Sequence, residues 1–468
     1  MTHAFDHAPP ADALPAEIFR AYDIRGVAGR TLTPAGVARI GFAIGQRVRA
    51  AGGSSAVVGR DGRLSGPELA GALIAGLRGA GVDVIDVGAV PTPVVYFAIQ
   101  HYGAGGGVAV TGSHNPPEYN GLKIVVGGVT LAGEDIAALR TEAQAADWSG
   151  LRGGLEAREV LGDYVTRIAG DVRLERPLRV AADCGSGITG VVAQRLLQAI
   201  GAQVTMLYDT VDGTFPHHHP DPAKPENLKD LIATVTGQGL DLGLAFDGDG
   251  DRVGVVTGSG RIVWPDRLLI LLARDVLARE PGATIIFDVK CSRTVPAAIA
   301  AAGGKPLMWK TGHSIIKAKL RETGAALAGE MSGHIFFKER WYGFDDGLYT
   351  ACRLLEFLSG QPDGADAVFD AIPDTVTTPE LHVGFAEGEH YAMMRRLAAA
   401  ADFPGLDVST LDGLRVDWPD GFALVRPSNT TPMLVLRFEG DDQAALERAQ
   451  SAFRALFRRV APELALPF

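Results

Sequence analysis

The sequence predicts an α/β protein in which three α/β units are followed by a fourth unit of the α+β class. Short β-branched stretches alternate with Ala/Leu/Gly-rich stretches of helical length, which is typical of βαβ units with a parallel-rich, buried sheet. This alternation restarts twice, and it gives way to strand-like segments in roughly the last ninety residues. A chain of 468 residues with 47% hydrophobic side chains also has enough apolar material for several packed cores.

The first unit is expected over residues 1–157. An apolar strand at 56–59 precedes a helical stretch at 66–80, and a second strand follows at 82–87. A further apolar strand at 107–110 runs directly into a turn-forming sequence. The order of these segments predicts a βαβ unit whose last strand ends at a polar turn.

Two further units repeat this alternation without a strict sequence repeat. The second, over residues 158–260, contains a strand at 178–182, and the third, over residues 261–372, contains a strand at 284–287. Each strand follows a polar or helical stretch, and the boundaries fall in segments rich in glycine, proline and charged residues. We therefore expect three α/β units in series.

The fourth unit, residues 373–468, is expected to be α+β. Strands are predicted at 380–383, 414–418 and 433–438, and a helix from about 442 to 459 closes the chain. This change from alternating helices and strands predicts an antiparallel sheet covered by a helix.

Composition and charge exclude several partners and locations. A net charge of −11 argues against nucleic-acid or anionic-membrane partners, because either needs a dominant basic face. The three cysteines lie far apart without a CxxC pair, which predicts neither a disulfide framework nor a zinc ribbon and fits a reducing cytoplasm. The N-terminal segment lacks the features of a signal peptide, and the longest apolar run, 268–273, is too short to span a bilayer. We therefore expect a cytoplasmic protein.

A serine lies in the turn that follows the strand at 107–110. The turn reads Thr-Gly-Ser-His-Asn-Pro-Pro from residue 111, so Ser113 lies beyond the carboxyl end of a strand, where open α/β sheets bind ligands. His114 supplies a titratable donor, and Lys123 supplies a cation on the next predicted strand. An isolated serine in a turn usually caps local structure, but these neighbours favour a reactive hydroxyl.

Three aspartates alternate with glycines between two apolar strands. Asp247, Asp249 and Asp251 occupy every second position, so their carboxylates can converge on one hard cation and leave an open coordination site. A calcium EF-hand loop is disfavoured, because Arg252 stands where that loop needs glycine. The segment predicts a metal site facing a phosphate, and a solvated acidic turn is the alternative.

Two further loops carry polar groups suited to a phosphosugar. Glu330 and Ser332 can bind adjacent sugar hydroxyls, although such residues are ordinary in a surface turn. Arg426, with the hydroxyl and amide side chains that follow it, can cradle a phosphate dianion or form a polar hairpin. Three consecutive histidines, 217–219, lie in a proline-rich loop that we expect to be solvated or interdomain rather than metal-binding.

Together these segments resemble the α-D-phosphohexomutase superfamily, most closely its bacterial phosphomannomutase/phosphoglucomutase branch. The resemblance spans essentially the whole chain and rests on the four loops above and on Phe-Arg-Ala-Tyr-Asp-Ile-Arg-Gly at residues 19–26. It implies four domains around a central cleft: three related α/β domains with mixed sheets and a C-terminal α+β domain that rotates to close over the substrate. It also implies one Mg²⁺ per chain, small-molecule phosphosugar partners and, by analogy within the branch, a monomer.

The resemblance assigns roles by position in this sequence. Ser113 is implied to carry the phosphoryl group and to share the binding of Mg²⁺ with Asp247, Asp249 and Asp251. The other implied catalytic residues are Arg25, His114, Lys123, Arg252 and His313. The implied substrate-binding residues are Tyr22, Lys290, Glu330, Ser332, Arg426, Ser428, Asn429 and Thr430.

The implied reaction is the reversible interconversion of hexose 6-phosphate and hexose 1-phosphate, for mannose and glucose, through a phosphoserine and a hexose 1,6-bisphosphate. Met331 and the Asn-Thr-Thr at 429–431 resemble the mannose/glucose type rather than the phosphoglucosamine mutases. If Glu330 and Ser332 hold O3 and O4, the C2 epimers stay undistinguished. The proton carrier is left open among Lys123, His114 and His313.

Two other functions fit parts of the sequence. A phosphatase or phosphotransferase with an aspartyl nucleophile in the 247–251 loop would release orthophosphate and would not need Ser113. A non-catalytic sugar-phosphate-binding or calcium-binding protein would bind its ligand without isomerisation and would carry no covalent phosphate. A phosphate adduct on Ser113 of the purified protein distinguishes the mutase from both.

Overall fold

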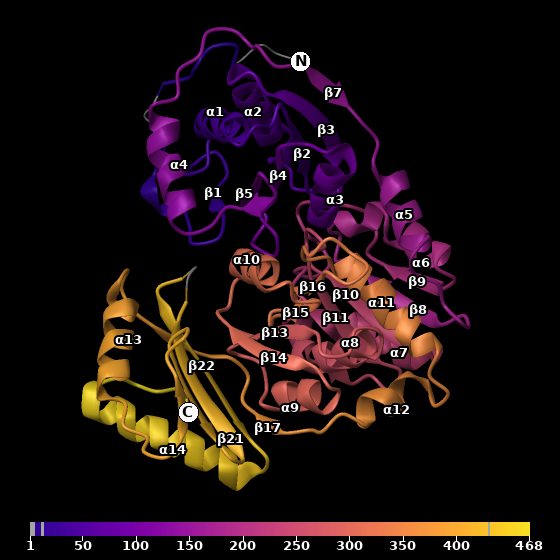
Figure 1. Cartoon of the computed structure of the whole chain (residues 1–468), viewed down its shortest axis with the longest axis vertical. Helices are drawn as coiled ribbons and strands as arrows, with labels where there is room; N and C mark the ends of the chain where they lie inside the picture. Colours follow the sequence, from indigo (N-terminus) through magenta and orange to yellow (C-terminus); the bar gives the residue numbers. More distant parts are fainter. Residues whose placement is uncertain (1–4, 11–13, 429–430) are drawn as a thin grey trace.

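The computed structural model describes residues 5–10, 14–428 and 431–468. The described strands form four sheets, one in each of four successive domains. Figure 1 shows the domains following one another from the indigo top, through magenta and orange on the right and in the centre, to yellow at the lower left. The expected architecture of three α/β domains and a C-terminal α+β domain is confirmed.

Domain I contains a mixed sheet in the order β1-β5-β4-β2-β3-β7, with β6 paired to β5. Its strands are β1 (Ile24–Val27), β2 (Ser55–Arg60), β3 (Asp83–Ala89), β4 (Gly106–Val110), β5 (Tyr119–Val126), β6 (Val129–Thr130) and β7 (Leu155–Ala157). Its helices are α1 (Pro34–Ala50), α2 (Gly66–Gly79), α3 (Thr92–Tyr102) and α4 (Glu134–Gln144), and a 3₁₀ helix, η1, spans Ala16–Ile18. Helix α1 starts after Thr33, whose side chain accepts a hydrogen bond from the Gly36 N–H.

Domain II contains a five-stranded sheet in the order β12-β11-β10-β8-β9. Its strands are β8 (Arg179–Asp183), β9 (Gln203–Leu207), β10 (Leu242–Phe246), β11 (Val253–Thr257) and β12 (Ile262–Val263). Its helices are α5 (Leu161–Ala169), η2 (Ile188–Val191), α6 (Ala193–Ala199), η3 (Pro225–Leu228) and α7 (Lys229–Gln238). Because β12 pairs with β11, this sheet extends past the expected boundary at residue 260.

Domain III contains a four-stranded sheet in the order β14-β13-β15-β16. Its strands are β13 (Thr284–Asp288), β14 (Lys305–Trp309), β15 (Leu327–Gly329) and β16 (Ile335–Phe337). Its helices are α8 (Pro265–Arg279), α9 (Thr294–Ala301), α10 (His313–Thr323), α11 (Gly347–Ser359) and α12 (Gly364–Asp370).

The first three sheets share one four-strand arrangement. The orders β5-β4-β2-β3, β11-β10-β8-β9 and β16-β15-β13-β14 correspond strand for strand, with three parallel strands and one antiparallel strand at the end. In each, a loop connects the last parallel strand to the antiparallel strand, and these loops contain Ser113, the three aspartates and Glu330. The related fold therefore repeats one position for predicted site residues in three domains.

Domain IV contains an antiparallel sheet in the order β17-β22-β21-β20-β19, with β18 also paired to β22. Its strands are β17 (Val376–Thr377), β18 (Leu381–Gly384), β19 (Asp407–Ser409), β20 (Leu414–Trp418), β21 (Gly421–Pro427) and β22 (Met433–Gly440). Its helices are α13 (Glu389–Ala400) and α14 (Gln443–Val460). Helix α14 starts after Asp442, which accepts a hydrogen bond from the Ala445 N–H at 2.8 Å.

The apolar cores show which domains are packed together. One buried cluster includes side chains from domains I, II and III, among them Phe97, Leu244 and Leu355. Domain IV has a separate core, and a small cluster of Val289, Phe422 and Leu424 connects it to domain III. The first three domains therefore share a continuous core that domain IV does not join.

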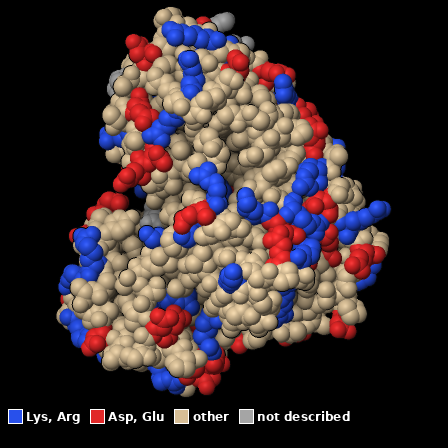
Figure 2. Space-filling model, viewed as in Figure 1, with Lys and Arg blue, Asp and Glu red and all other residues tan. Residues whose placement is uncertain are grey.

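Hydropathy, cysteine placement and surface charge can be read from the described ranges. No helix there combines the length and apolar character needed to cross a lipid bilayer. All three cysteines are buried and free. Figure 2 shows Lys and Arg interspersed with Asp and Glu, so the described residues on this face form no continuous basic surface.

Candidate active site

Ser113 lies in the loop between β4 and β5, and it is 1% exposed. Its φ angle of 50° is left-handed, a conformation that a non-glycine residue adopts only where its surroundings enforce it. Asp61 organises the preceding residues, because its carboxylate accepts hydrogen bonds from the Thr111 hydroxyl at 2.8 Å and the Gly112 N–H at 3.2 Å. The Ser113 N–H in turn donates to the Thr111 hydroxyl at 2.8 Å.

A buried arginine also stabilises the loop that contains Ser113. The Arg63 guanidinium donates to the carbonyl oxygens of Ser113 at 2.8 Å, Asn115 at 2.6 Å and Tyr119 at 2.9 Å. Burial lowers the pKa of Arg63, but the Asp61 carboxylate at 3.2 Å supplies a countercharge. Sequence reasoning missed both residues, although Arg-Asp-Gly-Arg directly after an apolar strand was the available signal.

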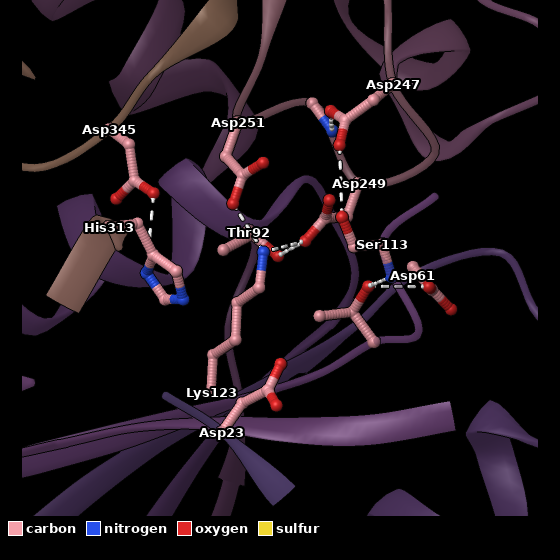
Figure 3. A network of polar contacts seen from close by, with 12 residues as sticks. Asp23, Asp61, Thr92, Ser113, Lys123, Asp247, Asp249, Asp251, His313 and Asp345 are labelled. Atoms are coloured by element: carbon pink, nitrogen blue, oxygen red, sulfur yellow. Dashed lines mark hydrogen bonds and ion pairs between the residues drawn. The ribbon is translucent and has the colours of Figure 1, made fainter. Parts of the chain in front are cut away.

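The predicted metal loop, residues 247–252, follows β10 and contacts Ser113. Asp247, Asp249 and Asp251 are fully buried, and each offers a carboxylate oxygen within 4.8 Å of the others. The Ser113 hydroxyl donates to Asp247 at 3.1 Å (Figure 3). One oxygen each of Asp249 and Asp251 has no hydrogen-bond partner among the described residues. Buried, unpaired carboxylate oxygens beside a hydroxyl fit a hard divalent cation.

Lys123 on β5 supplies the nearest positive charge. Its Nζ donates to Asp249 at 2.7 Å and also to Asp251, as Figure 3 shows. Burial by itself lowers the pKa of Lys123, but the carboxylates of Asp249 and Asp251 raise it well above its usual range. Burial, followed by the charges of Asp251 and Asp249, raises the pKa of Asp247 well above its usual range. Lys123 therefore neutralises only part of the negative charge of this loop.

Arg252 connects the metal loop to domain III. Its Nε donates to Nε2 of His334 at 2.9 Å, and Nδ1 of His334 lies 3.1 Å from Asp345. His313 Nδ1 lies 3.7 Å from the same Asp345 oxygen. His334 and Asp345 were missed from the sequence, although His334 stands only four residues after Glu330.

His114 lies between the serine loop and the histidine-rich loop. Its Nδ1 is 3.1 Å from the Ser113 hydroxyl, and its carbonyl oxygen contacts Nε2 of His219. His218 instead contacts Asp183 at 3.0 Å, so the 217–219 loop lies between domains I and II as expected. Burial, and then the charge of Arg252, lowers the pKa of His114 well below its usual range. A neutral imidazole is therefore favoured beside the serine.

The Glu330 carboxylate lies at the start of the third loop. Glu330 accepts a hydrogen bond from the Gly312 N–H, and its second oxygen has no partner among the described residues. Burial raises the pKa of Glu330 to about 7. Ser332 is half-buried two residues later. The buried oxygen of Glu330 can accept a hydrogen bond from a hydroxyl group of a ligand.

Residues from the N-terminal segment reach the other loops. The Tyr22 hydroxyl donates to the Thr311 carbonyl at 2.9 Å, which connects domain I to domain III. Arg25 donates to the Asn115 side chain at 3.0 Å and also pairs with Asp23. Both predicted residues therefore lie beside loops that carry other predicted site residues.

The predicted phosphate loop joins β21 to β22 and contacts domain III. Arg426 donates to Asp412 at 3.0 Å, and the same carboxylate accepts from the Thr311 N–H at 3.0 Å. Ser428 lies 2.9 Å from the Thr431 hydroxyl. Asn429 and Thr430, expected to bind phosphate, lie outside the described residues. Lys290, another expected substrate contact, donates to Glu380 at 2.7 Å.

Family models for phosphoglucomutase/phosphomannomutase match the chain along most of its length. The α/β/α domains I, II and III match residues 16–149, 162–260 and 264–375, and the C-terminal domain matches residues 380–456. The chain belongs to this family.

Individual phosphoglucomutase/phosphomannomutase proteins match over nearly the full length. A phosphomannomutase/phosphoglucomutase of Pseudomonas aeruginosa is 55% identical, covering 98% of this chain and 99% of its own. A phosphoglucomutase of Neisseria gonorrhoeae is 51% identical, covering 94% and 96%. The crystal structure of a phosphoglucomutase/phosphomannomutase family protein from Burkholderia thailandensis has a TM-score of 0.92 at 52% identity, covering 97% and 100%.

Proposed function

We propose that this chain interconverts hexose 6-phosphate and hexose 1-phosphate, of mannose and of glucose, through phosphorylated Ser113 and a hexose 1,6-bisphosphate. The observation that carries the proposal is the meeting of three elements at Ser113. Ser113, with its left-handed backbone, donates its hydroxyl to Asp247 at 3.1 Å, and Lys123 pairs with Asp249 and Asp251. Full-length relatives named as phosphomannomutase/phosphoglucomutase support the same reaction.

The side chains of Ser113, Asp247, Asp249 and Asp251 would hold one Mg²⁺. The unpaired buried oxygens of Asp249 and Asp251 support this assignment. When bound, Mg²⁺ neutralises negative charge on the phosphoryl oxygens. Lys123 pairs with Asp249 and Asp251, and Arg252 and Arg25 lie near the serine loop to balance the charge of a phosphate.

In the proposed transfer, the phosphoryl group passes between Ser113 and the sugar and is not lost to water. The bond between phosphorus and Oγ of Ser113 breaks while the acceptor hydroxyl of the hexose phosphate forms a new phosphorus–oxygen bond and gives up its proton. The bisphosphate then reverses its orientation and returns its other phosphoryl group to Ser113. Hexose 1,6-bisphosphate therefore also serves as the activator that phosphorylates a free enzyme. The candidate proton carriers remain Lys123, His114 and His313.

The other loops bind the part of the substrate that does not react. Glu330 and Ser332 hold sugar hydroxyls, which is supported by the buried unpaired oxygen of Glu330. Tyr22 and Lys290 contact the sugar phosphate. Arg426, Ser428, Asn429 and Thr430 clamp the distal phosphate.

The expected domain ranges, 1–157, 158–260, 261–372 and 373–468, remain a proposal, as do a monomeric state and a cytoplasmic location. The continuous core of domains I to III and the separate core of domain IV support a domain IV that moves as a unit. The free, buried cysteines are in keeping with a reducing compartment.

The deciding experiment combines intact mass with activity. The purified protein should carry a phosphate adduct that maps to Ser113, and Ser113→Ala should lose the adduct and at least 99% of turnover with glucose 1-phosphate and catalytic bisphosphate. Ser451→Ala, on the exposed surface of α14, is the matched control. Near wild-type turnover in Ser113→Ala, or stoichiometric release of orthophosphate, would refute the phosphoserine mechanism and favour an aspartyl nucleophile.

A further inference from the structure

A cavity of about 100 Å³ lies between domains I and III, away from the residues assigned above. Its walls come from α3, the β5–β6 turn, α10 and segment 338–344. Tyr96 and Phe344, 4% and 7% exposed, lie in its wall with ring centroids 5.5 Å apart. Tyr342 is 40% exposed and stacks on Phe344 at 6.0 Å. The cavity therefore runs from a buried aromatic wall to an exposed rim.

The charged lining of this cavity is entirely positive. Lys317, Arg321 and Lys338 line it, and no Asp or Glu does. Arg321 and Lys338 are exposed, and neither forms a salt bridge within the described part of the chain. The chain as a whole has 55 acidic and 44 basic residues, so an acid-free cluster of cations runs against its average charge. Such a lining attracts an anion.

Lys317, which is half-buried, connects the aromatic wall to this charge. The Lys317 Nζ lies 4.3 Å from the centroid of the Tyr96 ring and donates to Asp345 at 2.8 Å. The Tyr96 hydroxyl is buried and lacks a hydrogen-bond partner among the described residues.

We propose that this cavity binds a small aromatic anion, with its ring against Tyr96 and Phe344 and its acidic group toward Arg321 and Lys338. An apolar cavity of roughly 150 Å³ accommodates benzene, so the present cavity, at about 100 Å³, encloses only part of one ring and leaves its carboxylate or phosphate in the open rim. Aromatic rings also favour stacked or edge contacts with the two wall residues. Because no assigned active-site residue lines the cavity, binding does not require a hexose phosphate.

The bound anion also acts on the active site through Lys317. It attracts the ammonium away from Asp345, whose less neutralised carboxylate then draws His334, 3.1 Å away, more strongly toward itself and away from Arg252. His334 accepts the hydrogen bond of Arg252 beside the metal loop. Occupancy of the cavity therefore lowers kcat, and this consequence, unlike binding itself, rests on the proposed function.

The test uses 4-fluorobenzoate as the probe and ¹⁹F line broadening as the readout, with 4-fluorobenzyl alcohol as the neutral probe. Arg321→Gln and Lys338→Gln should each weaken binding of 4-fluorobenzoate about threefold, as expected for one exposed charge. Lys319→Gln removes the same charge from the same helix, but Lys319 pairs with Glu322 and does not line the cavity. This control should bind the probe as the wild type does.

Binding should persist at saturating glucose 1-phosphate, and the neutral probe should bind more weakly. Displacement by glucose 1-phosphate, equal binding of the alcohol, or an equal loss in Lys319→Gln would place the probe elsewhere and overturn the proposal. Absence of broadening in the wild type would do the same. If the probe binds at the cavity and leaves kcat unchanged, the link through Lys317 is refuted while the binding site stands.

Discussion

The charges around Ser113 are balanced only in part. Asp247, Asp249 and Asp251 are all fully buried, and Lys123 donates to two of them. Three carboxylates brought this close raise the pKa of Asp247 through burial and mutual repulsion, so a divalent cation would relieve an unfavourable arrangement. A site preorganised in this way would favour binding of such a cation.

Asp249→Asn tests this balance at a single residue. The substitution removes one negative charge and one ligand, so we expect the apparent affinity for Mg²⁺ to fall at least about tenfold. Activity and isothermal titration should both be followed against Mg²⁺. Asp209→Asn, an exposed aspartate of the same domain, is the control. An unchanged titration for Asp249→Asn would remove this loop from the metal site.

Arg63→Lys tests the support beneath the serine. Lysine cannot reproduce the planar guanidinium that donates to several carbonyl oxygens of the loop, so Ser113 should lose its fixed position. We expect kcat to fall at least about tenfold with a smaller change in KM, and the melting temperature to decrease. Arg78→Lys, which loses one hydrogen bond to Gly153 in the same domain, should leave kcat within about twofold.

At the scale of elements, one junction recurs in three domains. The last parallel strand leads into a polar loop and then into an antiparallel strand, as in β4–β5, β10–β11 and β15–β16. The carboxyl end of a parallel strand is where a sheet leaves backbone groups and side chains free for ligands. The strands are apolar because both faces are covered, and the loops carry the predicted site residues.

Helix α11 begins after Asp346, a buried residue that caps its first turn. Asp346 accepts hydrogen bonds from the Tyr349 N–H and the Tyr164 hydroxyl, each at 2.9 Å. Burial raises its pKa from 3.8 to about 7, so the folded state holds a proton that the unfolded state releases between these pH values. Its stabilising effect is complete below about pH 3.8 and is lost as pH rises through about 7.

Asp346→Asn should remove this pH dependence. Relative to the wild type, the variant should gain about 2–3 kcal/mol between pH 5 and pH 8, because asparagine keeps an acceptor and does not ionise. Urea unfolding at the two pH values measures the difference. Asp363→Asn, at the exposed start of α12, should show no such change. A constant difference for Asp346→Asn would contradict the shifted pKa.

At the scale of the whole molecule, domain IV is attached differently from the other three. Arg415 donates to the carbonyl oxygens of Val289 at 2.6 Å and Cys291 at 2.8 Å, and it lies over the Phe422 ring at 3.9 Å. Lys290 and Glu380 add an ion pair across the same junction. These polar contacts and one small apolar cluster allow domain IV to change orientation more easily than a shared core would.

Arg415→Lys should loosen this junction without unfolding either side. We expect KM for glucose 1-phosphate to rise several-fold with a smaller effect on kcat, because the phosphate clamp would be less well oriented. Limited proteolysis within residues 373–380 should also become faster. Arg395→Lys, on the exposed face of α13, is the control. Equal kinetics and equal cleavage would show that Arg415 does not set the position of domain IV.

The sequence by itself determined the fold class and the family and predicted four functional loops, because strands, turns and short motifs are encoded by neighbouring residues. Only the tertiary structure decided which side chains support those loops. Arg63 beneath Ser113, and His334 and Asp345 beside Arg252, act through contacts with residues far away in the sequence. The cavity between α3 and α10 is likewise formed by two domains. Local patterns specify elements, whereas packing between elements determines which buried charges become partners.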